Sequence, residues 1–152
     1  MPDEYEKALT HVAYEYAALE SAYNLAQTAT KTPPLIAAFD SFLVHYRSLV
    51  EFFAKEKHRK DDVRAKDYIA GWTTPPLPEW AKWKDQMHIL LAHLSTKRNE
   101  RIGFDHRNDF KPMLAEIQAA WEEFAKGLNG TPYDGKLEPL LKHRRENFSR
   151  IR

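Results

Sequence analysis

Four basic side chains at the margins of two apolar helix patterns are the group in this sequence most able to bind a ligand. His45 and Arg47 flank one apolar stripe, and His93 and Arg98 lie near the end of another. Imidazole titrates near neutral pH, and a guanidinium can grip an anion with two hydrogen bonds. If the two helices are neighbours, these four residues can share a site for an anionic ligand.

An aspartate-rich segment between those two helices supplies candidate partners for the basic side chains. Asp61, Asp62 and Asp67 are readily explained as helix caps and surface charges, but they also lie between the two basic pairs in the sequence. Since a buried charge without a partner is costly, we expect a histidine and an arginine to share a hydrogen-bonded cluster with one of these aspartates, beside a cleft. The predicted ligand-binding residues are His45, Arg47, Asp67, His93 and Arg98.

Apolar residues recur in steps of three and four along four long segments, which is the spacing of one face of an α-helix. The pattern predicts helices over 4–28, 33–56, 79–98 and 109–128, joined by proline-rich or polar segments. No segment alternates with the period of a strand. The expected fold is all-α: an antiparallel four-helix bundle with a short extra helix and a basic C-terminal tail. The stripe centres predict one core that contains Phe42, Leu49, Leu90, Leu94, Ile117 and Trp121.

Length and composition limit the class of protein. A chain of 152 residues fits one domain over 1–152, with about 131–152 as an extension packed on it. The net charge of +1 argues against a basic coat over the whole surface, and the absence of cysteine excludes disulfides and thiolate sites. No apolar run reaches the roughly 18 residues of a membrane span, and the acidic start is not a secretory signal. We therefore expect a cytoplasmic protein without a membrane partner.

A short stretch after the third helix pattern, Arg101-Ile-Gly-Phe-Asp-His106, has four residues between an arginine and a histidine. This spacing resembles that of the HEPN superfamily, small helical bundles that include metal-independent ribonucleases of toxin and phage-defence systems. The resemblance implies that Arg101 holds a phosphate and that His106 acts as acid or base, in a cleft between two subunits. It thereby implies RNA as substrate and a homodimer. This chain has Ile102 where the family tends to have a polar residue.

A second resemblance is to uncharacterised bacterial helical proteins. It rests on His-x-Arg-x-Leu-x-x-Phe-Phe over 45–53, the aspartate-rich link and Ala-His-Leu-Ser-x-x-Arg over 92–98. This resemblance implies no particular reaction.

Three functions remain open from the sequence. The first is a binding or interaction module whose His/Arg/Asp cluster takes an anionic or nucleic-acid ligand, and the alternative is the HEPN-like ribonuclease. The third is a metal-dependent bundle enzyme with a site pooled from several helices, such as His45, Asp67 and His93. The sequence contains no glycine-rich phosphate loop and no serine elbow, so we expect no nucleotide cofactor and assign no metal ligand.

Overall fold

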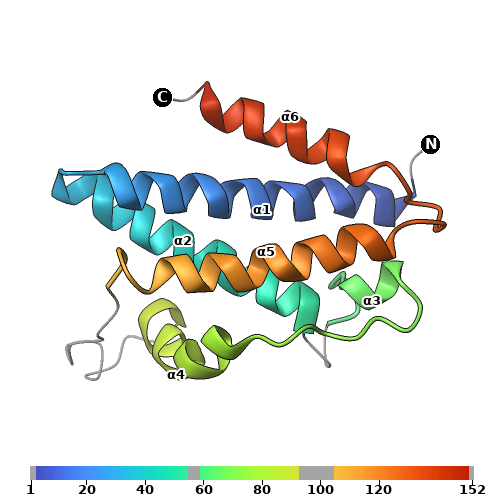
Figure 1. The fold of residues 1–152 in the computed structure, drawn as a ribbon, viewed down its shortest axis with the longest axis horizontal. Helices are drawn as coiled ribbons and strands as arrows, with labels where there is room; N and C mark the ends of the chain where they lie inside the picture. The colour runs from blue at the N-terminus through green and yellow to red at the C-terminus, as the bar shows by residue number, and fades with distance from the viewer. Residues whose placement is uncertain (1–2, 55–58, 93–104, 151–152) are drawn as a thin grey trace.

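The computed structural model describes residues 3–54, 59–92 and 105–150, with the backbone alone over 89–92. Within these ranges the chain forms six α-helices and no strand, which confirms the all-α class. The helices, shown in Figure 1, are α1 (Glu4–Thr28), α2 (Thr32–Ala54), α3 (Ala65–Tyr68), α4 (Pro78–Ala92), α5 (Phe110–Gly127) and α6 (Leu137–Ser149).

The four long helices predicted from the periodicity correspond to α1, α2, α4 and α5. The bounds of α1 are the predicted ones, and α5 is one residue shorter at each end than the pattern suggested. The predicted ends of the second and third helices, 55–56 and 93–98, lie outside the described residues. None of the described helices combines the length and the hydrophobicity needed to cross a bilayer.

Helix α1 is covered on two sides. It packs against α2 and α5 on one side and against α6 on the other, while α4 contacts α2 and α5. Figure 1 shows α6 running along α1 in the same direction, whereas α2 and α5 run the opposite way. The basic C-terminal segment is therefore largely helical, and it places its cations along α1.

The buried apolar residues form one core. Phe42, Leu49, Ile117 and Trp121 all belong to it, as the stripe centres predicted. The side chain of Leu90 and the whole of Leu94 lie outside the described residues. Stacked rings join the helices: the ring centroids are 4.0 Å apart for Phe42 and Phe110, and 4.1 Å apart for Tyr16 and Trp121. Such large apolar rings dominate the energetics of a core.

Side chains close the ends of the first two helices. Asp3 caps α1, its Oδ1 atom accepting a hydrogen bond of 2.6 Å from the backbone N–H of Glu6. At the end of α2, the carbonyl of Phe53 accepts hydrogen bonds from Trp72 Nε1 (3.0 Å) and Thr74 Oγ1 (2.9 Å). Because the last carbonyls of a helix have no partner within it, these two bonds fix the loop after α3 to the end of α2.

Candidate functional site

A histidine–carboxylate pair joins α1 to α2. The Nδ1 atom of His45 on α2 lies 2.7 Å from Oε2 of Glu15 on α1, and both side chains are partly buried. The Tyr14 ring meets the imidazole edge to face, with 5.9 Å between the ring centroids. A carboxylate that accepts a hydrogen bond from one ring nitrogen fixes the orientation of an imidazole. This pair links two hollows of the surface, because His45 lines one of them and Glu15 lines the other.

The first hollow is a groove of about 300 Å³ between α1, α2 and the C-terminal end of α6. Small and apolar side chains line most of it, with His45 at one side. The Phe148 ring of α6 approaches Tyr14 of α1, with centroids 5.6 Å apart. We call this hollow the α1–α2 groove and define it by Tyr14, Ala22, Leu25, Ala37, His45 and Phe148.

Helix α6 brings positive charge to the edge of the α1–α2 groove. The Arg144 guanidinium lies over the Tyr14 ring, 5.9 Å from its centroid, and makes no ion pair with any described residue. Its neighbour Arg145 is paired, because its Nε and Nη2 atoms donate to Glu20 of α1 at 2.8 and 2.9 Å. The bidentate pair fixes α6 on α1 and neutralises Glu20. Arg144 therefore remains as a cation at the groove.

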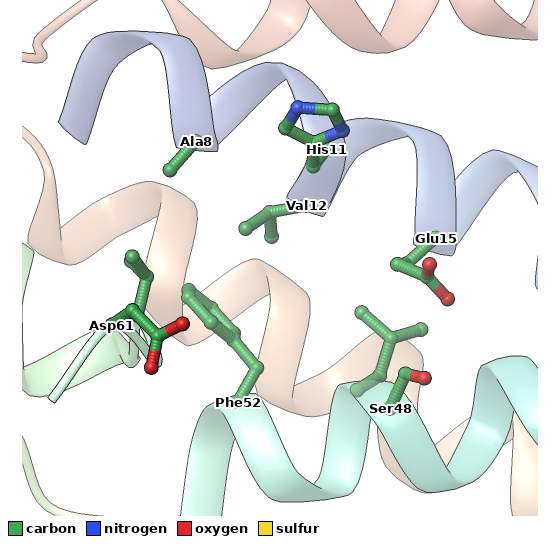
Figure 2. A pocket seen from close by; sticks show the side chains of 9 residues that line it. Ala8, His11, Val12, Glu15, Ser48, Phe52 and Asp61 are labelled. Atoms are coloured by element: carbon green, nitrogen blue, oxygen red, sulfur yellow. The ribbon is translucent and has the colours of Figure 1, made fainter. Parts of the chain in front are cut away.

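The second hollow, of about 320 Å³, lies between α1, α2 and the segment that precedes α3. Figure 2 shows Asp61 on one side of it and Glu15 on the other, with Val12 and Phe52 between them. His11 and Ser48 also line its walls. We call this hollow the acidic pocket and define it by His11, Val12, Glu15, Ser48, Phe52 and Asp61.

A buried carboxylate on α5 holds the start of α4. Glu116 is only 8% exposed, and its Oε2 atom accepts the backbone N–H of Glu79 at 2.8 Å. Its Oε1 atom accepts the N–H of Trp80 at 3.0 Å and also the hydroxyl hydrogen of Tyr46. The first N–H groups of a helix lack partners within the helix and carry partial positive charge. Glu116 is thus a helix cap supplied by a different helix.

Burial has the largest effect on the ionisation of the Glu116 carboxyl group. It raises the pKa of Glu116 above its ordinary value, although the hydrogen bonds from Tyr46, Glu79 and Trp80 act in the opposite direction. Burial also raises the pKa of Tyr46, with a further contribution from its bond to Glu116. The tyrosine therefore stays neutral and serves as a donor.

The structure places His45 and Arg47 with glutamates. The Nε atom of Arg47 lies 3.3 Å from Oε1 of Glu51 on the same helix. Asp67 accepts the backbone N–H of Arg64 at 2.8 Å, and its carboxylate also faces the Arg64 side chain. The described contacts therefore do not bring His45 or Arg47 to Asp67, and the proposed role of these residues in ligand binding stays a prediction.

Three of the predicted site residues, His93, Arg98 and Arg101, lie outside the described residues. His106 is described, in a turn just before α5, where its backbone carbonyl accepts a hydrogen bond from Gln27 Nε2 at 2.7 Å. Its role as acid or base stays a prediction. Among the described residues no group of three or more histidine and carboxylate side chains is arranged to hold a metal ion.

Two carboxylates of the site were not predicted from the sequence. Glu116 does leave a sequence signal, because it lies three residues after Met113 and four before Ala120, on the apolar face of α5. Glu15 leaves a weaker one, three residues after Val12 at the edge of the α1 stripe. Its contact with His45 depends on how α1 and α2 are rotated against each other.

No family model, curated protein or solved structure matches this chain.

Proposed function

We propose that the protein is a binding module that holds a short amphipathic helix of a partner protein, with acidic residues along its flanks, in the α1–α2 groove. The observation that carries this proposal is an exposed apolar groove with a cationic edge. The proposal specifies the ligand as an acidic peptide and assigns no reaction to the chain.

Exposed apolar side chains are concentrated on α1 and α2. Across residues 3–54, 59–88 and 105–150, five large apolar side chains are exposed, and all five lie on these two helices. Tyr5 is at the start of α1, away from the groove. Tyr14 (38% exposed) and Leu25 (46%) line the groove itself. Ile36 (55%) and Val44 (46%) lie on α2 outside the groove, each one residue before a groove residue and therefore turned to a different side of the helix. Exposed apolar side chains that line a groove, as Tyr14 and Leu25 do, mark an interaction site more often than scattered apolar residues do.

The length of the groove suits a helix of a few turns. Tyr14 and Leu25 lie eleven residues apart on one face of α1, which corresponds to roughly 16 Å. A bound helix that anchors residues i, i+4 and i+7 spans roughly 10 Å between its first and last anchor. The alanines between Tyr14 and Leu25 leave room for the side chains of such a helix.

Charge at the groove selects an acidic partner. Of the two α1 carboxylates nearby, Glu20 is paired with Arg145, and Glu15 lines the acidic pocket rather than this groove. Arg144 has no carboxylate partner among the described residues and stays available at the edge. Complementary charge at the rim of an interface increases the association rate and selects the orientation of the partner.

The same features favour a peptide over nucleic acid. Single-stranded nucleic acid is bound by stacking bases on exposed aromatic faces. Tyr14 already has the Arg144 guanidinium over its ring, and it contacts both Phe148 and His45. Besides the three ring-bearing residues, four alanines, Leu25 and two serines line the groove, and the alanines and Leu25 pack against aliphatic side chains better than against bases.

A peptide-display selection tests this proposal. A random peptide library is selected on the wild-type chain after depletion on Leu25→Asp, and the enriched peptides are compared with a U-rich RNA oligonucleotide in a fluorescence anisotropy assay. We expect enriched sequences with apolar residues at helical spacing and flanking aspartate or glutamate, and no RNA binding at physiological salt. Enriched peptides that are basic or lack the helical spacing would refute the proposal. So would RNA binding that Arg144→Glu abolishes.

A further inference from the structure

The acidic pocket is the second surface hollow with the character of a binding site, and it lies apart from the α1–α2 groove. Its volume of about 320 Å³ is at the lower end of the range typical of small-molecule sites. Val12, Leu49 and Phe52, all buried, form an apolar floor. Figure 2 shows the carboxylates of Asp61 and Glu15 on opposite sides of that floor. A ligand that fills this pocket therefore meets an apolar middle and two negative ends.

Both carboxylates retain acceptor capacity. Asp61 makes no hydrogen bond or ion pair with any described residue, and it is exposed at the mouth of the pocket. Glu15 uses its Oε2 atom for His45, and Oε1 has no described partner. No lysine or arginine is among the described residues that line the pocket. An ammonium group has three N–H donors and no acceptor, so it complements such oxygens.

We propose that the acidic pocket binds an aliphatic diamine or polyamine. One ammonium group donates to Asp61 and the other to Glu15, while the methylene chain between them lies over Val12, Leu49 and Phe52. The apolar floor favours a ligand with an alkyl chain, because the methylene groups are removed from water when the chain covers the floor. The two carboxylates, one on each side of the floor, favour a ligand with a positive charge at each end. This site does not depend on the function proposed for the α1–α2 groove.

Isothermal titration calorimetry with α,ω-diaminoalkanes of increasing chain length tests this proposal. Each diamine is compared with the n-alkylamine of the same length at matched ionic strength. We expect one chain length to bind best and to bind at least about tenfold tighter than its monoamine, since a hydrogen bond to a charged group contributes about that factor or more. Equal binding of diamine and monoamine, or no optimum in chain length, would overturn the proposal.

Two substitutions locate the binding. Asp61→Asn removes the charge of an exposed side chain, and Glu15→Gln keeps an acceptor for the His45 N–H. We expect each to weaken the best diamine about tenfold, towards the affinity of the monoamine. Asp40→Asn removes an exposed carboxylate from α2 at a position that does not line the pocket, and it should leave the affinity unchanged. If all three variants bind alike, the amines associate with the surface at large and the proposed site is wrong.

Discussion

His45 of α2 and Glu15 of α1, joined at 2.7 Å, belong to different hollows of the surface. His45 lines the α1–α2 groove, and Glu15 lines the acidic pocket. A change to either residue therefore affects both hollows. The two proposals can be tested separately with residues that belong to one hollow alone. These are Leu25 and Arg144 for the groove and Asp61 for the pocket.

Removing the Glu116 carboxylate should destabilise the fold. In Glu116→Ala the Tyr46 hydroxyl and the N–H groups of Glu79 and Trp80 lose their acceptor. Buried donors without a partner cost free energy, and loss of a helix cap adds to that cost. We expect the free energy of unfolding to fall by about 2–4 kcal/mol in urea denaturation.

The matched control is Glu122→Ala, which removes an exposed carboxylate from the same helix. Its effect should stay within about 0.5 kcal/mol. If the two variants lose equal stability, Glu116 does not cap α4.

The stability of the wild type should also depend on pH through Glu116. Burial raises its pKa, so the folded protein retains this proton at pH values where the unfolded chain has released it. The resulting stabilisation is fully present below the ordinary carboxyl pKa and is lost as pH rises through the raised value. The free energy of unfolding of the wild type and of Glu116→Gln is measured from about pH 4 to neutrality. As pH rises, the stability of the wild type should fall relative to that of the variant. If the wild type instead gains stability relative to the variant as pH rises, the three hydrogen bonds lower the pKa of Glu116 by more than burial raises it.

Leu49 tests the packing of the core. It is buried on α2 and belongs to the predicted core. Leu49→Ala should lower the free energy of unfolding by about 2–5 kcal/mol, because it leaves a cavity. Val44→Ala on the exposed side of α2 should change it by no more than about 0.5 kcal/mol. Equal losses from the two variants would place the wrong face of α2 in the core.

The helices could be predicted from the sequence because apolar spacing records which face of a helix is buried. The stripe that contains Phe42 and Leu49 faces the core, and so does the one that contains Ile117 and Trp121. The end of the chain was harder to predict, because its short apolar pattern does not show which neighbour covers it. The hydrogen bond of Lys136 to Glu6 and the Arg145 pair with Glu20 show that α1 is that neighbour.

The site was less predictable, because its contacts depend on pairs of side chains from different helices. His45 stood out by residue type, but the sequence does not show that Glu15 is rotated towards it. Asp61, Asp62 or Asp67 was expected to share a cluster with a histidine and an arginine of the predicted site, and the described partner of Asp67 is Arg64, three residues before it. A short-range cap of this kind competes with long-range pairing, because it does not require two helices to come together.

The ribonuclease alternative has a test of its own. It assigns any cleavage of RNA in the presence of a chelator to Arg101 and His106. His106→Ala should then abolish that cleavage without changing the melting temperature. Cleavage that survives the substitution would remove His106 from the catalytic residues.

The affinity of the best selected peptide for the α1–α2 groove tests the central proposal most directly. Leu25→Asp should weaken it about tenfold or more, since a buried leucine contact contributes about 1.5–3 kcal/mol. Arg144→Glu should also weaken it, with a loss that shrinks as salt is added. Asn24→Asp, which adds the same negative charge one residue before Leu25, and Lys111→Glu on α5 are the controls and should bind like the wild type. If Leu25→Asp and Asn24→Asp bind the peptide equally well, the groove is not its binding site.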